Sequence, residues 1–164
     1  MVRIKQLERQ QVMEQTRLKL LAAAAEEFAR AGYAEANINT ISTCAGYAKG
    51  TIYNYFPSKR ALLLDLIDTT AQLHLNFILA QVLPLSDPAL RLEQFYQAGF
   101  EFVSSYLAQA RVLFNTINGP DQEYKAHLFE AYQPMFQFLA DEILAPGIQR
   151  GIFRPVDPPS YCGE

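Results

Sequence analysis

The sequence has few of the residues that build disulfide frameworks and metal centres. Its 164 residues include two cysteines, Cys44 and Cys162, and two histidines, His74 and His127. Two cysteines are too few for a disulfide framework, so we expect free thiols. The histidines lie far apart, and neither has a second His or a Cys three or four positions away. Each is therefore expected to be a partly buried helix residue, and no metal site is predicted.

The sequence also lacks the motifs of common catalytic and membrane-bound proteins. It contains no phosphate-binding loop, no nucleophile elbow, no Cys-x-x-Cys and no His-Glu-x-x-His, so we expect neither an enzyme nor a cofactor, and we predict no catalytic residue. The sequence has no run of about 18 uninterrupted apolar residues, so we predict no membrane span. The polar N-terminus, MVRIKQLERQQ, does not resemble a signal peptide, and we expect a cytoplasmic protein.

Apolar residues recur at spacings of three and four throughout the chain, which predicts an all-α fold. The helices are expected at about 7–31, 38–45, 49–55, 58–83, 88–105, 110–117 and 121–145. Gly32 is expected to end the first of them, and Asp87 followed by Pro88 to begin the fifth. Pro134 is expected to bend the last one.

Residues 38–59 predict two short helices joined by a glycine turn, the form of a DNA-binding helix-turn-helix. Gly46 lies where the chain must turn sharply. Ile52 and Phe56 share one face of the second helix, and Pro57 ends it. An ordinary helical corner with aromatic packing would show the same local pattern.

The opposite face of the second helix carries side chains that suit DNA. Gly50, Thr51 and Asn54 point away from the core face, with Tyr53 and Tyr55 on the flanks. Glycine allows close backbone approach to a base pair, and hydroxyl and amide groups can hydrogen-bond to base edges. Tyr, Thr and Lys side chains can bind phosphates, and the predicted DNA contacts are Thr40, Lys49, Gly50, Thr51, Tyr53, Asn54, Tyr55 and Lys59.

The segment Thr16–Leu66 resembles the N-terminal DNA-binding domain of TetR/AcrR-type bacterial transcriptional regulators. The resembling residues are Ala23-Ala24, Phe28, Gly32-Tyr33, Ile38, Ile41, Ala45-Gly46, Lys49-Gly50-Thr51-Ile52-Tyr53, Tyr55-Phe56, Ser58-Lys59 and Leu62-Leu63. Ser42 stands where the family usually has alanine, and Gly46-Tyr47-Ala48 replaces its usual Gly-Val-Ser turn. Tyr47 is bulky for an inward-facing position, and we expect a slight shift of the second helix with DNA binding retained.

The charge distribution agrees with a DNA-binding N-terminal part. The net charge is −3, yet residues 1–64 contain nine Lys or Arg and five Glu. Residues 65–164 contain five basic and twelve acidic residues. Phosphate binding requires local positive charge, and the basic part coincides with the predicted helix-turn-helix.

The resemblance implies two domains, a three-helix DNA-binding domain at 1–57 and a helical effector-binding and dimerisation domain at 58–164. Fourteen of the twenty Phe and Tyr residues lie in 65–164. The resemblance implies an apolar, aromatic-lined effector pocket there, although aromatic residues at helical spacing are more often simple core. The predicted lining residues are Phe77, Tyr96, Phe100, Phe114, Phe129, Tyr132 and Phe136.

Chains of this family usually continue beyond a segment like 151–158 with two more helices that form the dimer interface. This sequence stops at Glu164, so we expect the C-terminal helices to be short or missing. The resemblance implies a homodimeric repressor that binds a palindromic operator and is released by a small apolar or aromatic effector. The alternatives are a DNA-bound protein that binds another protein without an effector, and a small helical enzyme or carrier.

Overall fold

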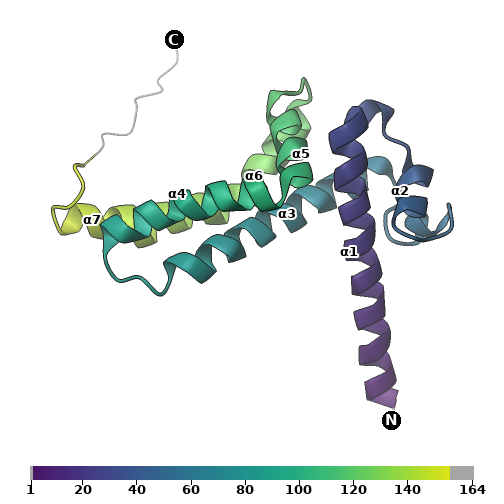
Figure 1. Cartoon of the computed structure of the whole chain (residues 1–164), viewed down its shortest axis with the longest axis horizontal. Coiled ribbons are helices and arrows are strands. Elements are labelled where there is room, and N and C mark those ends of the chain that lie inside the picture. The colour runs from purple at the N-terminus through teal and green to yellow at the C-terminus, as the bar shows by residue number, and fades with distance from the viewer. Residues whose placement is uncertain (1, 156–164) are drawn as a thin grey trace. The chain divides into compact units, whose positions relative to one another are not determined.

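The computed structural model describes residues 2–155, with side chains described for residues 6–155, and every regular element within that range is helical (Figure 1). The predicted all-α fold is therefore confirmed. Expectations about Cys162 and about the last residues of the chain fall outside the described range. The elements are α1 (Val2–Glu35), α2 (Ile38–Cys44), η1 (Thr51–Asn54), α3 (Lys59–Val82), α4 (Pro88–Ser105), α5 (Leu107–Asn118), α6 (Gln122–Phe138), η2 (Leu139–Leu144) and α7 (Ala145–Gln149).

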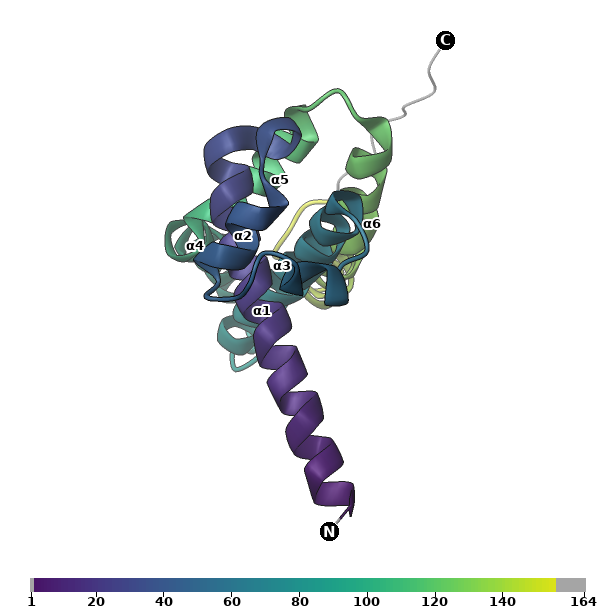
Figure 2. The same cartoon turned by 90° about the vertical axis from the view of Figure 1, so that its right-hand side faces the viewer.

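The chain forms two compact units, and unit 1 comprises residues 1–73 and 103–131. In unit 1, α1 packs against α2 and α5. Leu20 and Phe28 of α1, Ile41 of α2, and Leu62 of α3 are among its fully buried side chains. The first turns of α1 project from the rest of this unit in two perpendicular views (Figures 1 and 2), and residues 6–15 are all exposed.

Within the described range, unit 2 comprises residues 74–102 and 132–155. Its buried core consists of Ile78, Val82, Phe95, Ala98, Met135 and Ile143. The Arg91 guanidinium of α4 ties two segments together, because it donates to the carbonyl of Leu85 at 2.6 Å and to that of Glu142 at 3.1 Å. The boundary predicted between residues 57 and 58 lies inside unit 1, and it stays a prediction.

Several helix ends follow the sequence signals. Gly32 interrupts α1 with a φ of 77°, which only glycine adopts readily. Asp87 begins α4 as predicted, since its Oδ1 accepts the N–H groups of Ala89 and Leu90. Helix α1 begins earlier than expected, at Val2, and Pro134 lies within α6, which passes directly into the π-helix η2.

The predicted second helix of the helix-turn-helix is wrong in type and length. An α-helix was expected over 49–55, but the structure has a four-residue 3₁₀ helix, η1. The N–H groups of Thr51, Tyr53 and Tyr55 each bond to the carbonyl three residues earlier. Pro57 lies three positions after the end of η1 and supplies no N–H, so the segment cannot continue as an α-helix.

Helix α3 is the one described helix that is long and apolar enough to cross a membrane, judged by length and composition alone. Its most apolar window has a mean hydropathy of 1.2, and 39% of that window is buried within the protein. Leu62 and Ile67 belong to the core of unit 1, and Ile78 and Val82 to that of unit 2. The apolar character of α3 is thus explained by its use in both cores.

Candidate nucleic-acid interface

The turn between α2 and η1 is built as the sequence predicts. Gly46 has a φ of +85°, in the left-handed region that favours glycine. Before it, the side chain of Asn37 caps α2 by accepting the N–H groups of Asn39 and Thr40. Ile52 and Phe56 are 1% and 3% exposed, which confirms that they form the inner face of this segment.

The two departures from the family pattern are both accommodated by hydrogen bonds. Ser42 is fully buried, and its hydroxyl donates to the Ala48 carbonyl at 2.6 Å, which spans the turn. The Tyr47 phenol donates to the hydroxyl of Thr16 on α1 at 3.2 Å. The bulky Tyr47 therefore ties the turn to α1.

Replacing Ser42 with alanine is expected to lower the free energy of unfolding by about 1 kcal/mol, the net value of one hydrogen bond. The loss is small because the Ala48 carbonyl still accepts the N–H of Thr51. Urea denaturation measures this change, with Ser105→Ala at an exposed position as the matched control. A loss above about 3 kcal/mol, or no loss, would contradict this role for the hydroxyl.

The eight predicted DNA contacts lie on α2, the turn, η1 and the segment that leads into α3. Lys49, Gly50, Tyr53 and Asn54 are exposed, and Tyr53 has 54% of its surface accessible. The remaining four are half-buried, namely Thr40, Thr51, Tyr55 and Lys59. All eight belong to unit 1, where α2, η1 and the start of α3 follow one another in the chain. Their roles toward DNA stay a prediction.

Lys59 is also a structural residue, which the sequence did not indicate. Its ammonium group donates to the carbonyls of Ala34 and Ala36, at 2.7 and 2.9 Å, and lies 5.1 Å from the centre of the Tyr33 ring. The start of α3 is thereby fixed to the end of α1. An ammonium group has three donors, so one remains available for a phosphate.

Buried and half-buried acids and bases hold the elements beneath this surface. Glu27 of α1 accepts the backbone N–H of Asn37 at 3.1 Å, next to α2. Hydrogen bonds from Arg30 and from that N–H lower the pKa of Glu27 below its ordinary range. Arg17 donates to Asp65 on α3 at 2.6 Å. Sequence reasoning missed these positioning residues, because partners such as Arg17 and Asp65 are 48 positions apart.

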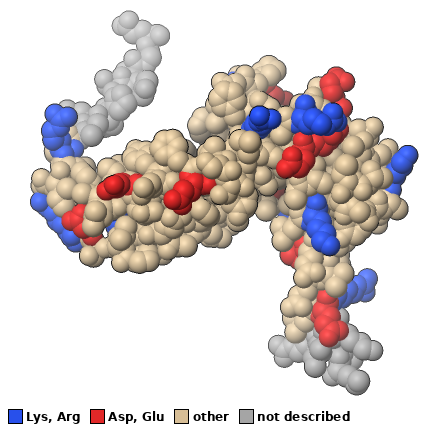
Figure 3. Space-filling model, in the orientation of Figure 1, with Lys and Arg blue, Asp and Glu red and all other residues tan. Residues whose placement is uncertain are grey.

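The surface of unit 1 carries basic groups among acidic ones. Figure 3 shows Lys and Arg side chains at several points on the face that α1 and α2 present in that view. Lys49 and Lys19 are exposed, and Arg30 is exposed although it is paired with Glu27. Local positive charge of this kind suits a phosphate backbone.

Among residues 2–155 there is no cluster of three or more His, Cys, Asp or Glu that could hold a metal ion. Cys44 is a free, exposed thiol. His127 pairs with Asp68 at 2.8 Å, and His74 lies against Tyr132, so both histidines have protein partners.

The segment that contains α2, the Gly46 turn and η1 matches a known family in sequence. Residues 20–66 match the profile of the bacterial regulatory proteins of the tetR family. This segment of the chain is TetR-like. The chain is a TetR-like, DNA-binding transcriptional regulator, and the segment from α2 to the start of α3 is its candidate DNA-reading head.

Known TetR-type proteins resemble the chain well beyond this head. The transcriptional repressor KstR2 of Mycobacterium tuberculosis is 28% identical over 151 residues, covering 84% of this chain and 68% of KstR2. The fatty acid degradation regulator FadR of Bacillus halodurans superposes with a TM-score of 0.76 at 26% identity. FadR of Bacillus subtilis, solved with stearoyl-CoA, superposes with a TM-score of 0.77 at 24% identity and shows the shared fold. Each alignment with FadR covers 85% of this chain and 75% of the other.

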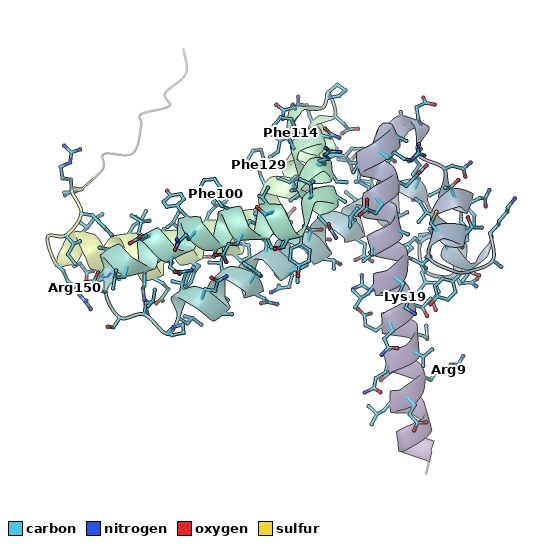
Figure 4. The ribbon with its side chains drawn as sticks, in the orientation of Figure 1. Arg9, Lys19, Phe100, Phe114, Phe129 and Arg150 are labelled. Atoms are coloured by element: carbon cyan, nitrogen blue, oxygen red, sulfur yellow. The ribbon has the colours of Figure 1, made fainter. Side chains whose placement is uncertain are left out.

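The seven predicted effector residues are divided between the two units. Phe77, Tyr96, Phe100, Tyr132 and Phe136 belong to unit 2, whereas Phe114 and Phe129 belong to unit 1. Tyr96, Phe100, Phe114, Phe129 and Phe136 are 53–74% exposed, and Figure 4 shows three of them, Phe100, Phe114 and Phe129, pointing outward. Only Phe77 and Tyr132 pack against the core of unit 2. Their binding of an effector stays a prediction.

A polar pair that the sequence did not reveal lies beside that core. His74 Nδ1 is 3.3 Å from the Tyr132 hydroxyl, and the His74 ring stacks on Phe102 at 4.0 Å between centroids. His74 Nε2 is buried and has no hydrogen-bond partner. Burial lowers the pKa of His74 from 6.5 to about 4 and raises the pKa of Tyr132. Both groups are therefore neutral at pH 7.

Acidification is expected to weaken the fold through His74. The unfolded chain takes up the proton near pH 6.5, whereas the folded chain resists it until about pH 4. The stability that neutral His74 contributes is therefore present above pH 6.5 and lost as the pH falls toward 4. Allowing for its partial exposure, the loss is about 2 kcal/mol. Urea denaturation at several pH values in this range should show the loss in the free energy of unfolding. The free energy of a His74→Phe variant should fall less steeply with pH. Equal pH dependence of the two proteins would contradict this role of His74.

Proposed function

We propose that the chain is a repressor that binds a palindromic operator as a homodimer in the cytoplasm and is released by a small apolar effector. The observation that carries the proposal is the DNA-reading head. Exposed Lys49, Tyr53 and Asn54 stand on a segment whose inner side chains, Ile52 and Phe56, are buried. A two-fold protein reads two half-sites, which gives the palindrome.

The predicted DNA contacts fall into two groups, those near base edges and those that bind phosphates. Gly50, Thr51, Tyr53 and Asn54 approach base edges or the nearby backbone in the major groove. An asparagine can pair in a bidentate manner with adenine, and a threonine methyl can contact thymine. Thr40, Lys49, Tyr55 and Lys59 bind phosphates, and these contacts set the register without reading sequence.

Support for an apolar acyl effector comes from unit 2 and from the relatives. FadR of Bacillus subtilis was solved with stearoyl-CoA. In this chain, Phe77, Phe102 and Tyr132 supply apolar surface, and the unsatisfied His74 Nε2 supplies a hydrogen-bonding group for a carbonyl or hydroxyl. We therefore propose a ligand with a long apolar part and one uncharged polar group.

The charges of unit 2 favour the acyl part over a strongly anionic head. Arg91, Arg150 and Arg154 are its basic residues within the described range. The Arg91 guanidinium already donates to two backbone carbonyls. A coenzyme A head carries several phosphate charges and would have few partners, so affinity is expected to come from burial of the chain.

Helix α3 links effector and operator along the chain. It begins with Lys59 in the reading head and carries His74 and Ile78 in unit 2. An effector that binds one arrangement of α3 more tightly shifts the equilibrium between DNA-competent and incompetent states. Such coupling typically changes affinity by about 5- to 150-fold.

The proposal that an acyl effector releases the operator is tested by operator titration in the presence of stearoyl-CoA or stearic acid. Fluorescence anisotropy of a labelled operator is expected to show weaker binding, with a smaller change for His74→Phe. Unchanged operator affinity with both ligands would remove the acyl-effector proposal and leave the DNA-binding assignment intact.

A second candidate is a DNA-bound protein that recruits another protein without an effector. Tyr96, Phe100 and Phe136 of unit 2 are each more than half exposed. Exposed aromatic side chains are enriched at protein interfaces. In this case Phe100→Ser would abolish binding of the partner protein and leave operator affinity unchanged. Stearoyl-CoA would change operator affinity in neither the wild-type chain nor the variant.

A further inference from the structure

A cavity lies in unit 1, and none of its lining residues belongs to α2 or η1. Its volume is about 380 Å³. Its walls come from the end of α1, the first turns of α3, the end of α5 and the start of α6. We propose that it binds a small neutral or cationic aromatic compound of one or two rings, and that this compound is a second regulatory ligand.

The walls suit a planar ring. Phe28 and Leu63 are 2% exposed and form apolar surface on one side. The Tyr33 ring lies 5.7 Å from that of Phe28 and meets the Tyr124 ring edge-on at 5.3 Å. Aromatic rings attract a further ring in stacked or edge-to-face geometry. The volume falls within the range of small-molecule sites, about 300–1,000 Å³.

The polar rim selects the charge of the ligand. The lining residues include Asp121, Asn115 and Thr116, and no Lys, Arg or His. The Tyr33 and Tyr124 hydroxyls are hydrogen-bonded to each other at 3.0 Å. Burial raises the pKa of Tyr33 to about 12, so its phenol is neutral at pH 7. The Asp121 carboxylate in the lining would repel an anion and attract a cation.

Occupancy of this cavity is coupled to the reading head through Tyr33. The same ring faces the Lys59 ammonium at 5.1 Å, and that ammonium holds the carbonyls of Ala34 and Ala36. The next residue, Asn37, caps α2. A ring that stacks on Tyr33 changes the environment of Lys59 and hence the seating of α2. This coupling to operator affinity rests on the proposed function, whereas ligand binding itself does not.

Binding can be measured with the ligand as its own fluorophore, because the chain contains no tryptophan. The probes are indole, tryptamine and indole-3-acetate, which share one ring system and are neutral, cationic and anionic. Each is titrated with the full chain, with no DNA present, while indole fluorescence is excited where tyrosine does not absorb. Indole and tryptamine are expected to bind, and indole-3-acetate at least ten-fold more weakly.

Variants on neighbouring positions locate the binding. Asn115→Phe and Ala34→Phe place a ring in the cavity and are expected to weaken indole binding at least ten-fold. Asn118→Phe on the same helix lies outside the lining and should leave it unchanged. Thermal unfolding of each variant verifies the fold, and the two cavity variants provide independent tests. Absence of indole and tryptamine binding, or binding that both cavity variants leave intact, would overturn the proposal.

Regulation is then tested on a selected operator. Indole is expected to change the operator affinity of the wild-type chain about five-fold or more and to have no effect on Asn115→Phe. Ligand binding in the cavity with unchanged operator affinity would overturn the regulatory part. If the chain bound no operator at all, the proposed function would fail while the binding site stood.

Discussion

Replacing Asn54 with alanine is expected to weaken binding to the selected operator by about 5- to 150-fold, equivalent to about 1–3 kcal/mol. Asn54 is exposed at the end of η1, and its neighbour Ile52 is held in the core. Its amide is thereby directed away from the protein, where it can donate to and accept from one base. Binding to unrelated DNA should be unchanged, because that binding depends on phosphates.

Lys49→Ala provides the matched contrast for Asn54→Ala. Loss of this exposed ammonium should weaken specific and non-specific binding alike and reduce the salt slope by about one. Arg150→Ala serves as the neutral control, because Arg150 is the exposed residue that follows α7. Anisotropy titrations at several salt concentrations distinguish these cases. Equal losses on specific and unrelated DNA for Asn54→Ala would contradict a base-reading role for this residue.

Replacing Ile52 with alanine is expected to lower the free energy of unfolding by about 2–5 kcal/mol, because it leaves a cavity in the core of unit 1. Ile52 is 1% exposed and is the buried residue of η1. A four-residue 3₁₀ turn has little stability of its own, so it depends on this anchor. Operator affinity should fall as well, since Tyr53 and Asn54 flank the lost side chain.

Denaturant unfolding with Ile52→Val and Ile117→Ala separates packing from other effects. Removal of one methylene at position 52 should cost about 0.5–1.5 kcal/mol. Ile117 is 43% exposed, and its truncation should change stability by less than about 1 kcal/mol. If Ile52→Ala were no more destabilising than Ile117→Ala, Ile52 would not be the anchor of the head.

Local signals in the sequence predicted much of the fold. Gly46 and the pair Ile52 and Phe56 were assigned correctly because turn chemistry and helical spacing act over a few residues. Asp87 was predicted as a helix cap for the same reason. The type of η1 was not predicted. In a segment this short, the sequence does not distinguish hydrogen bonds to the carbonyl three residues earlier from bonds to the carbonyl four residues earlier.

Features formed by distant residues could not be predicted. His74 and Tyr132 are 58 positions apart, and the unsatisfied Nε2 appears only once the chain is folded. Helical spacing also cannot separate an inward from an outward aromatic residue. Phe102 is 1% exposed, whereas Phe100, two positions earlier, is 74% exposed, and the sequence predicted Phe100 as a pocket residue. Lys59 was predicted to bind phosphate. Its hydrogen bonds to two backbone carbonyls were not predicted, because those carbonyls lie more than twenty positions away in the sequence.

The central claim, that the surface of η1 and its flanking residues reads DNA, is tested most directly by selection from a random duplex library. Wild-type chain and Asn54→Ala are selected in parallel at about physiological salt, and the recovered pools are sequenced. The predicted result is an inverted repeat for the wild-type chain and relaxed preference at one position of each half-site for Asn54→Ala. Recovery of no enriched sequence by the wild-type chain, or of identical motifs by both chains, would contradict the claim.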